Sequence, residues 1–168
     1  NAKTFITLKE ELAFSNRYLS LLNERYGHQV HVDYNIPSEL LNYGIIRNVF
    51  QLLIENYFVH GCDTSKEDNF IYFRGESLDD TTMVLRMEDN GTGMDNAELA
   101  SLNARIEQPI RHNEKSYGLK NLNQRIKLFY GPDFGIHLSS GKQGGLLVEI
   151  VLQKITVDEY ESKRRKDL

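Results

Sequence analysis

The chain has 168 residues, a formal net charge of −4 and one cysteine. This length suits a single domain with one core, and a lone Cys62 fits a reducing compartment such as the cytoplasm. The negative charge argues against binding to a nucleic-acid backbone. No apolar run approaches the roughly 20 residues that a membrane helix needs. The chain starts without methionine, so we expect it to be a fragment of a longer protein.

The N-terminal part of the chain predicts a helix followed by a strand. Apolar residues recur at three- and four-residue steps over residues 6–26, which is the spacing of an amphipathic helix. Thr7 and Glu10 are placed to form a capping box at its start, and Gly27 to end it. Alternation around two valines predicts a strand over residues 28–34.

The middle of the chain predicts the main helix and a hairpin. Ser38 follows a proline and is expected to cap a stretch of helical material. The main helix is expected over residues 45–60, with Gly61 ending it. Alternating patterns predict strands over residues 70–77 and 81–89, joined by a short polar turn.

The C-terminal part predicts two further helices and a second pair of strands. Asp95 is expected to cap a helix that ends near residue 106, and residues 107–116 have no strong periodicity. Gly118 begins a helix that ends at the Gly131-Pro132 pair. The remaining expected elements are strands over residues 136–138 and 146–152 and a frayed helix after residue 155.

The most informative motif is EDNGTGM, which follows the strand over residues 81–89. It places the Asp89 carboxylate on a rigid platform, and Gly91 and Gly93 leave open space before it because they have no Cβ. A carboxylate so placed can bind a flat heterocycle, although Asp-Asn-Gly is also a strong turn signal. A dinucleotide fingerprint is excluded because its third glycine is replaced by Asn96, and no phosphate-binding P-loop occurs.

A second candidate group lies at the end of the main helix. Asn56 and His60 are four residues apart, so they share one helix face, whereas Glu55 lies on an adjacent face. An amide oxygen is a suitable Mg²⁺ ligand when phosphates supply the other oxygens, and His60 would then face phosphate. The alternative is that Asn56 caps a local backbone group and His60 is exposed near the helix end.

The third candidate group is the start of the helix at Gly118. Free N–H groups at a helix N-terminus suit phosphate, and Lys120, Asn121 and Arg125 can add side-chain contacts. Taken alone, this segment also fits an ordinary surface helix with scattered basic residues. The three groups occur in an order that points to one nucleotide site.

These motifs resemble the ATP-binding superfamily shared by gyrase, the heat-shock-90 chaperone, histidine kinases and MutL. ENYFVHG resembles the N box, DNGTGM the first glycine box and SYGLKNLNQRIKLFYG the second. The pattern, with its lead-in helix, is most similar to the catalytic domain of YesM/LytS-like sensor histidine kinases and covers nearly the whole chain. The resemblance implies a Bergerat fold, an α/β two-layer sandwich whose mixed, mostly antiparallel sheet is covered on one face by helices.

The resemblance also implies site roles for residues of this chain. Asp89 would bind the adenine amino group, Asn56 would bind Mg²⁺, and Asn121 would approach the phosphates of ATP. Glu55 is a further catalytic candidate beside Asn56. The remaining residues expected to bind ATP are His60, Gly91, Gly93, Met94, Tyr117, Gly118, Leu119 and Lys120.

A sensor kinase of this kind transfers the γ-phosphoryl group of ATP to a histidine, and none of the five histidines here has the acceptor pattern. The resemblance therefore implies acceptor and dimerisation helices outside this chain, a response regulator as partner, and a membrane-attached homodimeric parent with this domain in the cytoplasm. Residues 1–27 would lead in from the acceptor region, residues 28–155 would form the ATP-binding domain, and residues 156–168 a charged tail.

The chain departs from the family pattern at three positions. Ser116 replaces the first glycine of the second box, Leu146 replaces a threonine after Gly145, and Leu52 replaces both a proline and the acid of ATP-hydrolysing relatives. Leu52 cannot accept a proton, which favours a kinase over an efficient ATPase. Two alternatives remain: a degenerate nucleotide-binding or scaffolding module, and a protein serine kinase of the anti-sigma type.

Overall fold

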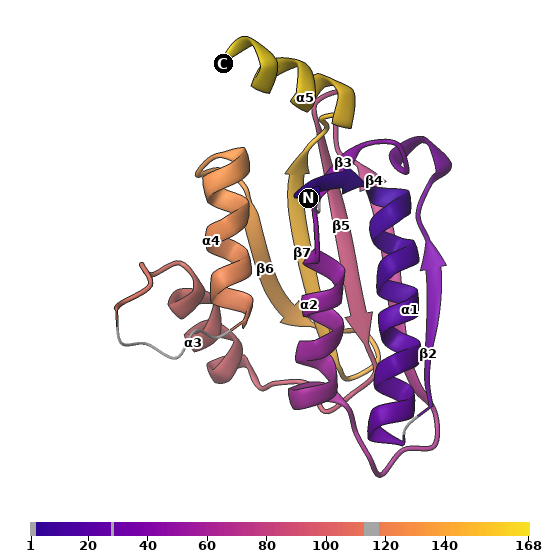
Figure 1. Cartoon of the computed structure of the whole chain (residues 1–168). Helices are drawn as coiled ribbons and strands as arrows, with labels where there is room; N and C mark the ends of the chain where they lie inside the picture. The colour runs from indigo at the N-terminus through magenta and orange to yellow at the C-terminus, as the bar shows by residue number, and fades with distance from the viewer. Residues whose placement is uncertain (1–2, 28, 113–117) are drawn as a thin grey trace.

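The computed structural model describes residues 3–27, 29–112 and 118–168, and its centre is a five-stranded sheet of order β2-β4-β5-β7-β6 (Figure 1). Only the β2 and β4 pair is parallel, and the other neighbouring strands are antiparallel. The strands are β2 (Val30–Asn35), β4 (Asn69–Ser77), β5 (Thr82–Asp89), β6 (Gly135–Ser140) and β7 (Leu146–Gln153).

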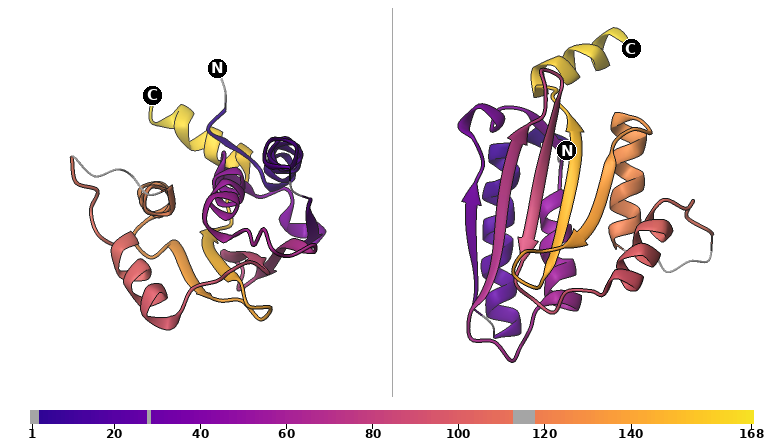
Figure 2. Two further views of the ribbon diagram at one scale, coloured as in Figure 1. Left: turned by 90° about the horizontal axis from the view of Figure 1, so that it is seen from below. Right: turned by 180° about the vertical axis from the view of Figure 1, so that it is seen from behind.

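Helices cover one face of this sheet. Three of them, α1 (Leu8–Tyr26), α2 (Val49–Asn56) and α4 (Gly118–Tyr130), lie in front of the strands, with α3 (Asn96–Ile106) beside β6 (Figure 1). The rear view shows no described helix over the opposite face (Figure 2). The expected two-layer α/β sandwich is confirmed. None of the helices in the described ranges is long and apolar enough to cross a membrane.

The core lies between the central strands and α2. Inward side chains alternate along each strand, as with the fully buried Met83 and Leu85 of β5. They pack against the apolar face of α2, where Val49, Phe50 and Ile54 are also buried. Burial of this face fixes the helix that carries Asn56.

The expected start of the main helix is wrong, because residues 44–46 form a strand. β3 (Gly44–Ile46) pairs with β1 (Phe5–Thr7) in a separate two-stranded sheet. Asn48 then has a left-handed backbone, φ 72°, which interrupts any helix, so α2 begins at Val49. The last turn of the expected helix is a π-helix, η2 (Tyr57–Gly61).

Two further expectations about helix ends are corrected. Ser38 does not cap a helix, because it lies inside a 3₁₀ turn, η1 (Ser38–Leu40), that begins after Pro37 without a side-chain cap. The C-terminal segment is a regular helix, α5 (Val157–Lys166), whose capping box joins Thr156 and Glu159. The capping box of Thr7 with Glu10 and the left-handed Gly27 at the end of α1 are confirmed.

A buried carboxylate holds α2 against α1. Glu11 of α1 is 1 % exposed, and its two oxygens accept hydrogen bonds from the backbone N–H groups of Asn48 (3.0 Å) and Phe50 (3.0 Å). Burial raises the pKa of Glu11, and these hydrogen bonds oppose that rise. Glu11 thus satisfies the free donors at the start of the helix that leads to the site.

Asparagine side chains cover backbone groups on both edge strands. On β2, the N–H and C=O of Val30 bond to Asn23 of α1, at 2.9 and 3.1 Å. On β6, the same two groups of Leu138 bond to Asn103 of α3, at 3.0 and 2.8 Å. Asn123 of α4 accepts a further bond from the N–H of Ile136, at 2.9 Å.

Candidate functional site

The three candidate groups meet at one end of the molecule. The last residue of β5, the end of α2 with η2, and the first turn of α4 all lie toward the lower end of Figure 1. One pocket at this end is lined by the polar residues Asn56, His60, Asp89 and Thr92 together with Gly61 and Gly93. The long-range packing therefore unites groups that are far apart in the sequence.

Apolar side chains form the walls of this pocket. Met87 of β5 and Val148 of β7 are cross-strand partners, so both project to the helix-covered face beside Asp89. The other apolar lining residues are Leu53, Tyr57, Met94 and Leu146. A mostly apolar pocket with one carboxylate in its lining suits an aromatic heterocycle.

Asp89 is 4 % exposed, and one of its two carboxylate oxygens is hydrogen-bonded to the backbone. Its Oδ1 accepts hydrogen bonds from the backbone N–H groups of Gly91 (2.8 Å) and Leu146 (3.3 Å). Within the described ranges, Oδ2 accepts no hydrogen bond. Burial raises the pKa of Asp89 to about 6, opposed by the bonds from Gly91 and Leu146. Oδ2 is not among the buried polar atoms that lack a partner in the described part of the chain, so it is open to the pocket, where it can accept a hydrogen bond from a ligand.

Glycines surround Asp89 because the backbone segments pass too closely for side chains. A Cβ on Gly91 would lie 1.9 Å from the carbonyl oxygen of Gly61, and one on Gly145 would lie 2.2 Å from Asp89 Oδ1. Gly93 has a left-handed backbone, φ 65°, and a Cβ there would meet the carbonyl oxygen of Gly144. Gly91 and Gly93 are thus required by the close approach of neighbouring loops.

Neighbouring side chains lock the surroundings of Asp89. The Glu88 carboxylate, on the opposite face of β5, accepts a hydrogen bond from the backbone N–H of Lys142 (2.7 Å) in the turn before β7. Asn90 is committed to backbone groups of Asp68 and Phe70, at 2.8 and 2.9 Å. Asn90 therefore supports the loop and does not face the pocket as a ligand group.

The end of α2 places Asn56 and His60 in the pocket and Glu55 elsewhere. Asn56 is half-buried, and its side chain makes no hydrogen bond within the described part of the chain. Glu55 lies on the side of α2 that faces α1, beside the Tyr18 hydroxyl; burial, with Glu55 as a second cause, raises the pKa of Tyr18. Glu55, Asn56 and His60 nevertheless line one hollow together with Gly118.

The start of α4 extends the site away from Asp89. Gly118 and Leu119 line a further hollow, distinct from the one that contains Glu55. This hollow shares Asn56, His60 and Met94 with the Asp89 pocket. Lys120 is 4 % exposed, and neither it nor the half-buried Asn121 is among the residues that line this hollow. Tyr117 and Ser116 lie outside the described residues.

Sequence reasoning missed the apolar walls and one cation. Leu102 and Arg105 of α3 line the hollow that contains both Gly118 and Leu119. Met87 and Val148 could have been found from the alternation of β5 and β7, because they share the face of Asp89. Arg105 has no comparable signal, since its place depends on how α3 packs.

The donor set favours a metal shared with a ligand over a metal held by protein alone. Among the described residues, no group of three or more His, Cys, Asp or Glu side chains could hold an ion. The Asn56 amide oxygen can supply one ligand, and phosphate oxygens would supply others. Apolar walls, a carboxylate with an unpaired oxygen and a helix N-terminus thus fit a nucleotide with its metal.

The chain matches no known family model, but it has relatives among curated proteins. It is 31 % identical over 141 residues to the sensor protein LytS of Staphylococcus haemolyticus, which covers 83 % of this chain and 23 % of LytS. It is 26 % identical over 155 residues to the sensor protein kinase HptS of Staphylococcus aureus, covering 91 % and 29 %. It is 25 % identical over 152 residues to the uncharacterised protein YwpD of Bacillus subtilis, covering 90 % and 51 %.

Solved structures share the fold across almost the whole chain. The catalytic domain of the histidine kinase ThkA superposes with a TM-score of 0.63 at 16 % identity, covering 93 % of this chain and 99 % of that domain. The chain is a catalytic-domain homologue of the LytS-like sensor histidine kinases. The mycobacterial sensor histidine kinase MprB gives a TM-score of 0.60 at 14 % identity, over 91 % of this chain and 99 % of that one. The chain spans about half or less of the length of these curated relatives.

Proposed function

We propose that this catalytic domain binds ATP with Mg²⁺ and transfers the γ-phosphoryl group to a histidine on a segment outside the chain. The observation that carries the proposal is the Asp89 carboxylate in a mostly apolar pocket: the residue is 4 % exposed, its Oδ1 is hydrogen-bonded to the backbone, and its Oδ2 is open to the pocket. The exocyclic amino group of adenine is a donor of the right kind. A guanine or pyrimidine carbonyl at that point would face the carboxylate with an acceptor instead.

Each residue of the site has a role in this proposal. Asp89 holds and orients the base, Met87 and Val148 contact its faces, and Asn56 ligates the metal. The first turn of α4 presents its N–H groups to the phosphates, while Arg105 supplies positive charge nearby and His60 can donate a hydrogen bond. Bound ATP would supply the phosphoryl group, and Mg²⁺ would neutralise its charge, so the chain acts by positioning and electrostatics. Leu52 leaves no base one turn before Asn56 to activate water.

The proposal extends to the parent protein. We infer that α1 leads in from acceptor and dimerisation helices, that residues 28–155 are the ATP-binding unit, and that residues 156–168 are a C-terminal appendage. The parent would be a membrane-attached homodimer that passes its phosphoryl group to a response regulator, with this domain in the cytoplasm. These features are proposed from the resemblance to LytS and HptS, of which the chain spans only a part.

Calorimetric titration tests the binding step. A non-hydrolysable ATP analogue should bind with a stoichiometry of one, more tightly with Mg²⁺ than with a chelator. Incubation with radiolabelled ATP should leave the isolated chain unlabelled, because the acceptor lies elsewhere. Absence of any nucleotide binding would instead favour the scaffolding alternative, and labelling of a histidine in this chain would show that the acceptor was misplaced.

A further inference from the structure

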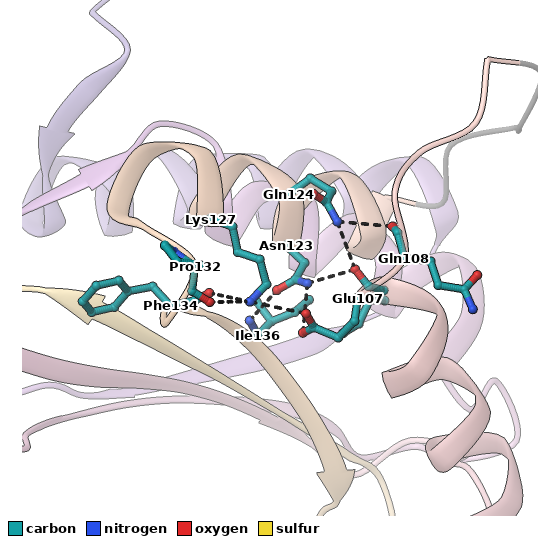
Figure 3. A network of polar contacts seen from close by, with 9 residues as sticks. Glu107, Gln108, Asn123, Gln124, Lys127, Pro132, Phe134 and Ile136 are labelled. Atoms are coloured by element: carbon teal, nitrogen blue, oxygen red, sulfur yellow. Dashed lines mark hydrogen bonds and ion pairs between the residues drawn. The ribbon is translucent and has the colours of Figure 1, made fainter.

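Asn123 lies at the junction of α3, α4 and β6 (Figure 3). Its side chain is completely buried. Its Nδ2 group donates to the carbonyl oxygen of Ile106 at 2.9 Å and to Glu107 Oε1 at 3.2 Å. Its Oδ1 accepts from the N–H of Ile136 at 2.9 Å. One amide thereby joins the end of α3 to α4 and to the edge strand.

Two neighbours on α4 hold the same segments (Figure 3). The Gln124 amide donates to the carbonyl oxygens of Ile106 and Gln108, at 3.5 and 3.3 Å. The Lys127 ammonium donates to the carbonyl oxygens of Pro132 and Phe134, each at 3.0 Å, and pairs with Glu107 at 3.3 Å. The end of α3 is therefore held to α4 by a set of side chains that all project from α4.

The backbone before β6 is shaped around this amide. Gly135 has a positive φ of 154°, and a Cβ built on it would lie 2.5 Å from Asn123 Oδ1. No other residue fits there without displacing the amide. The close approach shows that the position of Asn123 is specified from the strand side as well as from α3.

The network lies directly behind the Gly118 end of the site. Arg105 immediately precedes Ile106, whose carbonyl oxygen Asn123 holds, and Arg105 and Leu102 form one wall of the hollow. Gly118 and Leu119, one turn before Asn123 on α4, form the opposite wall. The separation of α3 and α4 thus sets the width of this hollow, and Asn123 fixes that separation.

We propose that Asn123 is a positioning residue for the phosphate half of the nucleotide pocket. This inference rests on the proposed function, because it assigns the phosphates to the hollow between α3 and α4. Asn123 touches neither nucleotide nor metal. It acts by holding α3 at the distance from α4 at which both walls reach the same phosphates, while the Asp89 end is held separately by the sheet.

The test compares ATP with adenosine, which lacks the phosphates. In Asn123→Ala, adenosine affinity should stay within about twofold of wild type, whereas ATP–Mg²⁺ affinity should fall about tenfold, a loss of about 1.4 kcal/mol. If Asn123 only stabilised the fold, its substitution would lower the unfolding temperature without changing the ratio of the two affinities. Asparagine and alanine are both uncharged, so the substitution adds no charge that would repel the phosphates.

Asn23→Ala is the matched control. Asn23 makes the same kind of amide bridge, between α1 and Val30 of the other edge strand, and it lies outside the residues that line the pocket. Its substitution should leave the ratio of ATP to adenosine affinity unchanged. An equal change of the ratio in both variants would overturn the inference.

Gln124→Ala provides a milder variant in case Asn123→Ala does not fold. Gln124 is half-buried, and its substitution removes two hydrogen bonds of the same network. The ratio of ATP affinity to adenosine affinity should therefore fall about threefold. An unchanged ratio in a folded variant of either kind overturns the positioning role of Asn123 and leaves the proposed function intact. Failure of the wild-type chain to bind either ligand overturns the proposed function itself.

Discussion

The two ends of the pocket are built in different ways. At the Asp89 end, the carboxylate sits on a central strand, and its bonds come from the backbone N–H groups of Gly91 and Leu146. At the Gly118 end, the walls belong to two helices, and side chains of α4 hold α3 in place. The first end can shift only if the sheet shifts, whereas the second depends on a few side-chain amides.

This difference separates what each end can contribute. A carboxylate fixed by backbone donors gives the same geometry whatever the surface residues are, which suits the choice of a base. Walls held by side chains can be moved by single substitutions, which suits tuning of phosphate affinity and turnover. We therefore expect substitutions near Asp89 to abolish nucleotide binding and those near Gly118 to weaken it by degrees.

Gly145→Ala should have the largest effect, because it breaks the Asp89 end through the backbone. The new Cβ would lie 2.2 Å from both the carbonyl oxygen and Oδ1 of Asp89, so β5 and β7 must separate. We expect a loss of about 3 kcal/mol in the free energy of unfolding, with nucleotide binding lost as well.

Gly27→Ala is the control for that experiment. Gly27 is left-handed, φ 66°, but has open space around a Cβ, so only the backbone cost of about 1–2 kcal/mol applies. Chemical denaturation measures both variants. Equal losses in the two would show that the packing around Asp89 has more room than the structure indicates.

Asp89→Asn should remove binding while keeping the fold. The amide oxygen can still accept from Gly91 and Leu146, but its NH₂ group would face the adenine amino group. We expect the affinity for adenosine and ATP to fall about 100-fold. Stability near neutral pH should not fall, because a buried charge is removed; calorimetry and thermal unfolding measure both effects, and normal binding would contradict the assigned role of Asp89.

Asn56→Ala should act at the middle of the pocket and only on the metal-dependent part of binding. Without the amide oxygen, Mg²⁺ should no longer strengthen ATP binding, which we expect to weaken about tenfold. Adenosine affinity should be unchanged. Gln51→Ala, on the first turn of the same helix and outside the Asp89 pocket, should leave the effect of Mg²⁺ intact; the same loss there would argue against a metal role for Asn56.

The smallest effect should come from pH. Burial raises the pKa of Asp89 to about 6, so the carboxylate gains a proton as the pH falls through that value. Adenosine affinity should fall about fourfold between roughly pH 7.5 and pH 5.5, since only the ionised form offers Oδ2 to the base. Without ligand the sign is opposite: this group's contribution to stability is fully present below its unfolded pKa and is lost as pH rises through about 6.

Other titrating groups lie close to Asp89 and need a control. The neighbouring Glu88 carboxylate adds to the rise of the Asp89 pKa, and the Lys66 ammonium opposes it. His60 lines the same pocket, so its contribution must be separated from that of Asp89. His60→Gln should keep the pH dependence of adenosine binding, and its disappearance in this variant would assign the effect to His60.

Much of the fold could be predicted from local patterns. The helices starting at Thr7 and Asp95 were predicted by their caps, and the hairpin of β4 and β5 by alternation. The strand over residues 44–46 could not be predicted in this way, because its apolar residues continue the pattern of the following helix. Its strand conformation depends on pairing with Phe5–Thr7, a contact across almost forty residues.

The residues of the candidate site also fall into those that local patterns predict and those that depend on long-range contacts. Asp89, Gly91 and Gly93 form a short local motif, so the sequence alone predicts their arrangement. Asn123 bonds to backbone groups 17 residues earlier and 13 residues later, and backbone groups have no sequence signature. The sequence therefore identifies the end of the pocket built from its own neighbours and gives no sign of the network that holds the other end.

The asparagines on the two edge strands have a consequence for how copies of this domain behave together. An exposed edge offers free N–H and C=O groups to which a strand of another molecule can add. Here Val30 and Leu138 have those groups occupied by the amides of Asn23 and Asn103. A strand of another molecule must first displace these amides, so the same side chains that join helices to the sheet also hinder strand addition at these two positions.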